Sequence, residues 1–192
     1  MNRMTNRDSS FQSLRVMLDA RLPAPAVLVV SAACDRDGPP TLACGLARAF
    51  AEAGRRTVII SLYDLAGGES SSPAVPDELA TWGGAVHYAP RGLREMSDVV
   101  SDLQSTHDVV LAVAPPVPKD PISLQISRLA HGVLLAVRLG RKITTDDETT
   151  VTQLQRVGAT LLGVVAMHHE AADLKRRYNV AVGAPPLEAA LN

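Results

Sequence analysis

The chain has 192 residues, a length that suits one domain with a core of its own. Its formal net charge of −1 gives no electrostatic argument for nucleic acid or an anionic membrane as a partner. Two cysteines, Cys34 and Cys44, are too few for a disulfide framework and are expected to be reduced thiols. The N-terminus is polar and no apolar run approaches bilayer length, so we expect a cytoplasmic protein, unless a partner holds it at the membrane.

The order of polar and apolar segments predicts where helices and strands lie. Residues 1–8 are expected to be disordered, and apolar residues at three- and four-residue steps predict a helix over 9–21. Short, largely apolar runs predict strands at 26–30, which is wholly apolar, and at 57–61, 85–88, 109–113, 133–137 and 161–165. Further helices are predicted at 41–53, 93–104, 122–129, 145–156 and 171–177.

The alternation of strands and helices predicts the fold class. It implies right-handed crossovers and a three-layer, doubly wound α/β domain with a mostly parallel sheet, covering residues 9–178 and followed by a tail at 179–192. Ligands in such folds bind beyond the carboxyl ends of the strands. The loops that follow Val30, Ile60 and Val113 are therefore where function is expected.

The loop after the first strand stands where a phosphate-binding loop, G-x-x-x-x-G-K-[ST], would lie. In that motif the backbone wraps the phosphates, the lysine neutralises them and the hydroxyl holds magnesium. Here Gly38 occupies the last glycine position, but Pro39 replaces the lysine and Pro40 replaces the hydroxyl residue. Proline has no N–H, so two donors are lost where a helix N-terminus should face a phosphate.

The other residues of this loop do not restore the motif. Asp35 and Asp37 would add negative charge beside a polyanion, Arg36 compensates only in part, and Thr41 still presents a hydroxyl. A helix start that tolerates proline in its first turn fits these residues better. We therefore expect no ATP or magnesium cofactor.

Several separated segments resemble bacterial capsular and exopolysaccharide tyrosine kinases, a P-loop family with relatives among the partitioning and septum-positioning ATPases. The segment Val29–Tyr63 is similar to the family's first loop, following helix and second strand. The segment His107–Val117 resembles Y-D-Y-V-I-I-D-T-P-P-V, and Leu129–Arg138 resembles L-A-D-G-V-L-L-V-V-R. The similarity spans roughly residues 9–167 and implies a P-loop NTPase-like fold.

The resemblance also shows which chemical groups are replaced. The family's D-x-D pair corresponds to Ser61-Leu62-Tyr63, and the aspartate that steers magnesium at a strand end corresponds to Val113. Phosphoryl transfer depends on positioning and on charge stabilisation by the lysine and the metal. We therefore expect a catalytically inactive relative with no catalytic residue and no metal site.

Two further family features bear on partners. The kinases self-associate through an E-x-x-R-x-x-R helix, with which Ser9, Gln12 and Arg15 align, and only Arg15 is kept. Their C-terminal tyrosine cluster is reduced to Tyr178. The resemblance implies a scaffold or regulator whose partner is a polysaccharide co-polymerase membrane protein, an active kinase paralogue or a second copy of the chain. No nucleic acid is expected.

Two alternatives stay open at the level of sequence. The first is a divergent ATP-binding kinase or ATPase that uses Arg36, Thr41 and Asp64 in a non-standard way. The second is a positioning protein of the partitioning type, which acts by forming dimers rather than by turnover.

Overall fold

A six-stranded sheet organises the computed structural model, which describes residues 6–63, 93–167 and 180–181. The strands are β1 (Ala26–Ala32), β2 (Thr57–Ser61), β3 (Val109–Val113), β4 (Gly132–Arg138), β5 (Leu161–Met167) and β6 (Val180–Ala181). The helices are α1 (Asn6–Asp19), the 3₁₀ turn η1 (Asp35–Asp37), α2 (Pro39–Glu52), α4 (Leu93–Thr106), α5 (Pro121–Ser127) and α6 (Thr145–Arg156).

The sheet has the order β2-β3-β1-β4-β5-β6, with β1 at its centre. Neighbouring strands from β2 to β5 run parallel, and only β6 is antiparallel to its neighbour. Chain order and spatial order differ, so successive strands are joined by crossovers over the faces of the sheet. The expectation of an α/β fold with a mostly parallel sheet is confirmed.

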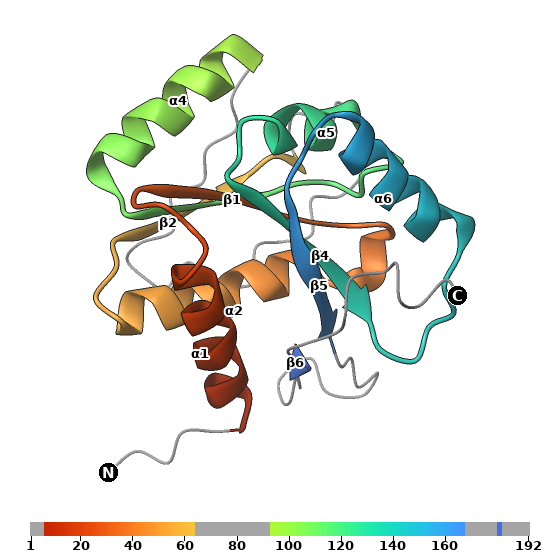
Figure 1. The fold of residues 1–192 in the computed structure, drawn as a ribbon, viewed down its shortest axis with the longest axis horizontal. Helices are drawn as coiled ribbons and strands as arrows, with labels where there is room; N and C mark the ends of the chain where they lie inside the picture. Colours follow the sequence, from red (N-terminus) through yellow and green to blue (C-terminus); the bar gives the residue numbers. More distant parts are fainter. Residues whose placement is uncertain (1–5, 64–92, 168–179, 182–192) are drawn as a thin grey trace.

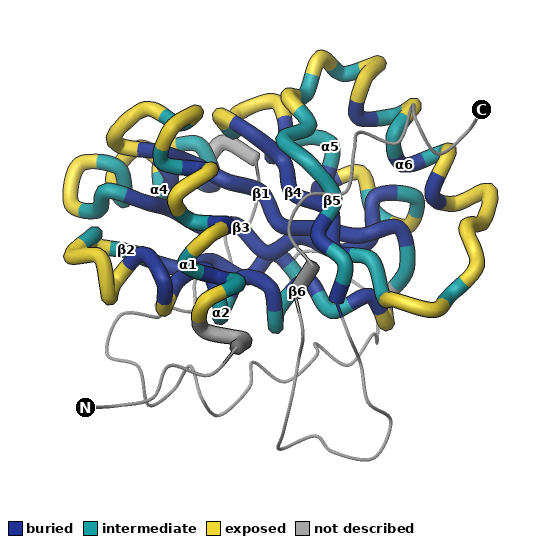
Figure 2. Tube along the Cα trace, turned by 60° about the horizontal axis from the view of Figure 1, so that its bottom comes forward, coloured by how far each residue is buried: buried dark blue, intermediate teal, exposed yellow. Residues whose placement is uncertain are grey.

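Helices cover both faces of the sheet (Figure 1): α1 and α2 lie on one face, and α4, α5 and α6 lie on the other. Alternate residues of β1 pack against the helices on opposite faces of the sheet. Leu28 and Val30 pack with α1 and α2, whereas Val27 and Val29 pack with α4, α5 and α6. Figure 2 shows the result, a buried band of strands within a shell of more exposed helices and loops. A strand buried on both faces needs the wholly apolar sequence from which it was predicted.

The packing of α1 on α2 depends on a glycine. A Cβ atom placed on Gly45 would lie 2.1 Å from Cζ of Phe11, so the bare backbone of α2 lets this ring approach. Phe11, Leu14 and Leu18 are all buried, and they are the apolar residues whose spacing predicted the helix. Among the residues that the structure describes, no helix is long and apolar enough to cross a membrane.

The ends of the chain differ from the sequence expectation. Helix α1 begins at Asn6, three residues before the helix start expected at Ser9; a first turn can be polar when the apolar face begins one turn later. In the expected tail, Val180 and Ala181 pair with Met167 and Ala166 and thereby cover the edge of β5. The strand predicted at 85–88 and the helix at 171–177 lie outside the described residues.

Candidate functional site

The loop between β1 and α2 lies at the carboxyl end of the central strand, where the sequence predicted a degenerate phosphate loop. After β1 the chain forms η1, and Gly38 then joins η1 to α2 in a left-handed conformation, with φ 82° and ψ 39°. A side chain is strained at such a φ, which explains the glycine at this turn. The loop thus has a strand–turn–helix arrangement, with Gly38 as the residue before α2.

Helix α2 begins at Pro39, two residues before its expected start at Thr41. Proline suits the first helical position because the N–H it lacks would have no partner inside the helix. Of the first three helical residues, only Thr41 carries a backbone N–H, and the first intrahelical bond runs from Leu42 N to Gly38 O at 3.1 Å. The helix start offers fewer amide donors than one without prolines would.

Asp37 is buried, with an exposed fraction of 1%, and it points into the protein. Its Oδ1 accepts hydrogen bonds from the backbone N of Arg138 at 3.1 Å and from Nε of Arg141 at 2.8 Å. Its Oδ2 accepts from Nη2 of Arg141 at 2.8 Å. The negative charge expected in this loop from Asp37 is therefore paired inside the protein with the guanidinium of Arg141, which the sequence did not indicate.

Arg141 also binds Asp147, and we call these three side chains the Asp37–Arg141–Asp147 cluster. Nη1 of Arg141 lies 2.6 Å from Oδ2 of Asp147, and Nη2 contacts Oδ1. Asp147 lies in the first turn of α6, where its Oδ2 also accepts from the backbone N of Thr144 at 2.8 Å. The hydrogen bonds from Arg141 hold the pKa of the Asp147 carboxyl below its usual value, although burial opposes this shift. In turn, Asp147 and then Asp37 raise the pKa of Arg141.

Sequence reasoning missed Arg141 as a partner of this loop. Arg141 and Asp37 are 104 residues apart, and no short motif surrounds Arg141. The strand order could have indicated this contact, because β4 is hydrogen-bonded to β1 and runs parallel to it. Their carboxyl ends therefore meet at one edge, where Figure 1 shows η1 beside the segment that follows β4.

The remaining predicted loop residues lie nearer the surface. Arg36 is exposed, and Thr41 is half-buried in the first turn of α2. Cys34, just before η1, is half-buried, and burial raises the pKa of its thiol. A raised pKa keeps the thiol protonated and therefore a poor nucleophile.

The positions of the family's acidic metal residues are brought together in the structure, but they carry no carboxylate. Ser61 and Val113 are register partners at the carboxyl ends of β2 and β3, and both are buried. Tyr63 is half-buried beyond β2, and Asp64 lies outside the described residues. Within the described ranges, no group of three or more His, Cys, Asp or Glu side chains is placed to hold a metal ion.

The candidate self-association residues of α1 make contacts within the chain. Nε2 of Gln12 donates to Oε2 of Glu52 in α2 at 2.8 Å, and Nε of Arg15 donates to Oε1 of Gln12 at 3.0 Å. Arg15 also pairs with Asp19 one turn later at 2.7 Å. Ser9 accepts a hydrogen bond at its carbonyl from Oγ of Ser13. Gln12 thus links α1 to α2, and Arg15 holds Gln12 in place.

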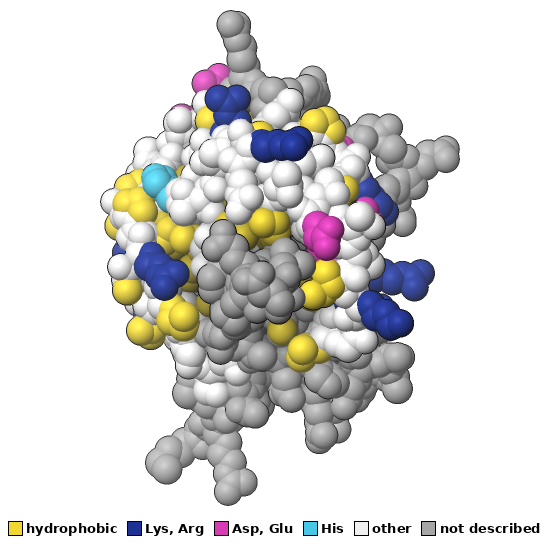
Figure 3. Space-filling model, turned by 45° about the vertical axis from the view of Figure 1, so that its right-hand side comes forward, with side chains coloured by type: hydrophobic (Ala, Val, Ile, Leu, Met, Phe, Trp, Pro, Cys, Tyr) yellow, Lys and Arg dark blue, Asp and Glu magenta, His cyan; other side chains and the backbone are white. Residues whose placement is uncertain are grey.

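Apolar side chains reach the surface close to the cluster. Leu139 and Ile143, on either side of Arg141 in the sequence, are 46% and 54% exposed. Figure 3 shows hydrophobic side chains at the surface in several places on one face of the molecule. Such residues are what a protein partner can cover, although single exposed apolar residues also occur on monomers.

Comparison with solved structures defines the class of fold. The chain shares its α/β fold with a chain of the MinC:MinD cell division protein complex of Aquifex aeolicus (TM-score 0.54, 16% identity, 74% of this chain and 68% of that chain). No protein-family model matches the sequence, and no curated protein matches it.

Bacterial tyrosine kinase domains share this fold with higher TM-scores. The kinase domain of Escherichia coli tyrosine kinase ETK gives a TM-score of 0.67 at 16% identity, over 90% of this chain and 80% of that chain. The VpsO kinase domain gives 0.61 at 18% identity, over 82% of this chain and 92% of that chain. The fold implied by the sequence resemblance is therefore confirmed.

Proposed function

We propose that this protein is a catalytically inactive relative of the exopolysaccharide-synthesis tyrosine kinases that acts as a scaffold or regulator through protein contacts. One observation carries the proposal: α2 starts with Pro39 and Pro40 where a phosphate loop has its lysine and hydroxyl. The partner that fits this role is a polysaccharide co-polymerase membrane protein, an active kinase paralogue or a second copy of the chain.

The local chemistry supports inactivity. The residues present do not suit ATP with magnesium, because the lysine position is a proline and the metal positions are Ser61 and Val113. Transfer of a phosphoryl group relies on these charges, and each 1.36 kcal/mol of lost transition-state stabilisation slows the reaction about tenfold. Loss of the lysine and the acidic ligands together leaves the chain without its main source of rate acceleration.

The preserved scaffold supports a role in binding. The sheet, both helix layers and the turn at Gly38 are kept, and Leu139 and Ile143 are exposed beside the replaced loop. The similar structures include a protein in complex with its partner, MinC:MinD, and a chimeric protein, CapA2B2. A domain that keeps its packing surfaces without its phosphate chemistry is suited to contact other proteins.

Calorimetric titration with ATP and magnesium tests the proposal. We expect no heat of binding from the natural chain. The matched variant Pro39→Lys with Pro40→Thr restores the motif residues at the helix start and is expected to bind more tightly than the natural chain. Micromolar binding by the natural chain that disappears in Arg36→Ala would overturn the proposal in favour of a divergent ATP-binding enzyme.

Light scattering after size exclusion, with and without nucleotide, separates the proposal from a positioning protein. A scaffold of the proposed kind keeps the same mass in both conditions. A dimer that forms only with nucleotide would favour the partitioning type and count against the scaffold proposal, because such a switch requires the loop to sense phosphate.

A further inference from the structure

The loop between β1 and α2 contains a carboxylate in a setting that would suit a bound anion. Nε and Nη2 of Arg141 and the backbone N of Arg138 all donate to Asp37. The side chains of Asp37 and Arg141 are 1% and 10% exposed. Two parallel N–H donors and one amide are a donor set that recognises small carboxylates and similar anions in general.

We infer that Asp37 is a built-in anion: it fills an anion-binding position formed by Arg141 and the Arg138 amide, and it keeps this loop closed without any ligand. The inference does not depend on the proposed function, since it concerns the donors and the carboxylate alone. Without the Asp37 carboxylate, Arg141 and the Arg138 amide would bind small carboxylate anions.

The rest of the cluster explains why the position would persist without Asp37. Asp147 holds Arg141 from the other side through Nη1 and Nη2, and Thr144 N holds Asp147. The guanidinium therefore keeps one fixed partner when the other is taken away. The Arg138 N–H belongs to the end of β4, which is hydrogen-bonded to strands on both sides. Only the Arg138 donor belongs to a strand; Arg141 lies in the segment between β4 and α6, where its contact with Asp147 of α6 holds it.

The directions of the donors, rather than net charge, define the anion position, because Asp147 also pairs with Arg141. The cluster contains two carboxylates and one guanidinium, and Asp147 is already satisfied by Arg141 and Thr144. An external anion can enter this position only by displacing Asp37, so the loop does not bind external anions while Asp37 is in place.

Chemical rescue of Asp37→Ala tests the inference. This variant removes the carboxylate and leaves a space that formate can fill. We expect a lower Tm than that of the natural chain, and a saturable rise in Tm when formate is added that chloride at equal ionic strength does not produce. Asp108→Ala is the matched control, because its carboxylate binds the exposed Arg56, and formate is expected to have the same effect as chloride on it.

The double variant Asp37→Ala with Arg141→Met sharpens the result. It removes the guanidinium donors, so formate is expected to give no rise beyond that of chloride. Equal responses to formate and chloride in Asp37→Ala itself would overturn the inference, because the donors would then have rearranged rather than remained available. Rescue that survives in the double variant would overturn it as well, since Arg141 would not be the receptor.

A measurement on the natural chain covers the case in which Asp37→Ala does not fold. Hydrogen exchange of the Arg138 amide reports its bond to Asp37 directly, and Asp37→Asn keeps the shape while removing the charge. We expect slow exchange in the natural chain and faster exchange at Arg138, but not at the central residues of β4, in Asp37→Asn. Fast exchange of Arg138 in the natural chain would show that Asp37 does not occupy the position.

Discussion

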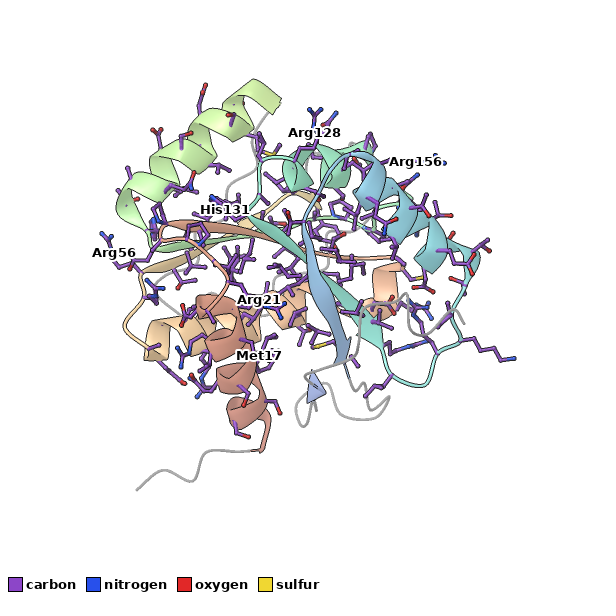
Figure 4. All side chains as sticks on the ribbon, in the orientation of Figure 1. Met17, Arg21, Arg56, Arg128, His131 and Arg156 are labelled. Carbon is purple, nitrogen blue, oxygen red and sulfur yellow. The ribbon has the colours of Figure 1, made fainter. Side chains whose placement is uncertain are left out.

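Two arginine–carboxylate contacts, at opposite edges of the sheet, use the same chemistry in different surroundings. At the carboxyl edge, the side chains of Arg141, Asp37 and Asp147 are 10%, 1% and 8% exposed. At the amino edge, Arg56 and Asp108 pair just before β2 and β3, with side chains 64% and 28% exposed. Figure 4 shows Arg56 extending outward from the end of the sheet. Water screens the second contact and is largely excluded from the first.

The difference in burial between the two contacts indicates where the stability of the fold depends on ion pairing. Ligands of this fold bind at the carboxyl edge, and there the chain has placed a buried cluster that joins segments 104 residues apart. The exposed pair joins the starts of two adjacent strands that the backbone already links, since Val109 N donates to Arg56 O. We therefore expect changes at the carboxyl edge to affect folding and changes at the amino edge to affect little beyond local titration.

Removal of the shared cation should have the largest effect. Arg141→Met leaves Asp37 and Asp147 buried without their counter-ion, and breaking such a contact costs about 3–5 kcal/mol of unfolding free energy. Urea unfolding measures this loss. The control is Arg128→Met, an exposed arginine at the end of α5 that points outward in Figure 4. Equal midpoints for the two variants would contradict the view that the cluster holds the two loops together.

Removal of one carboxylate should have a smaller effect, because Arg141 keeps its other partner. Asp147→Asn weakens a charged hydrogen bond and the contact with Thr144 N, and we expect a loss of about 1–3 kcal/mol. The neighbouring Asp146→Asn, at an exposed position of the same helix turn, is the control for the helix dipole. A loss as large as that of Arg141→Met would mean that Asp37 alone cannot balance the guanidinium.

Acid should reduce the destabilisation caused by Arg141→Met. The pKa of Asp147 is lowered, mainly by hydrogen bonds from Arg141, so the folded chain binds fewer protons there than the unfolded chain. This contribution is complete above the unfolded pKa of about 3.9 and is lost as the pH falls through the lower folded pKa. In Arg141→Met the buried Asp147 carboxylate has lost its counter-ion, so its pKa should rise, which makes protonation stabilising.

The free-energy gap between the natural chain and Arg141→Met should therefore narrow as the pH falls from neutrality toward about 4. Urea midpoints of both proteins across this range measure the gap. A gap that stays constant would indicate that solvent enters the cluster in the variant and hydrates both carboxylates.

Strands and turns could be predicted from the sequence, whereas the side-chain partners at the two ends of the strands could not. The strands and their order of alternation with helices follow from wholly apolar runs such as 26–30, since burial on both faces demands them. Gly38 and the two prolines that follow it are local signals of a helix start, although α2 begins at Pro39, two residues before the predicted start at Thr41. The direction of Asp37 is not a local property, because it depends on an arginine that reaches the loop only through the pairing of β4 with β1.

Exposed contacts were no easier to infer, for a different reason. Arg56 and Asp108 each precede a predicted strand, but the partnership becomes visible only when β2 and β3 are known to be neighbours. Sequence alone also placed the helix of Gln12 and Arg15 correctly while suggesting an intermolecular role for residues that contact α2 or one another. Side-chain partners are set by tertiary neighbours, which periodicity does not report.

The smallest effect is expected at the amino edge, where water screens the ion pair and a change in the pKa of Asp108 comes with only a small change in stability. Hydrogen bonds from the side chain and backbone of Arg56 lower the pKa of Asp108 to about 2. Arg56→Ala removes the side-chain donor and keeps the backbone donor, so the pKa of Asp108 should rise only part of the way toward its ordinary value of about 3.9. A carboxyl-carbon NMR titration measures this shift, and the urea midpoint at neutral pH should fall only by the small amount that this solvent-screened contact contributes. A midpoint shift approaching that of Asp147→Asn would remove the contrast between the edges, because an exposed pair would then stabilise the fold as much as a buried one.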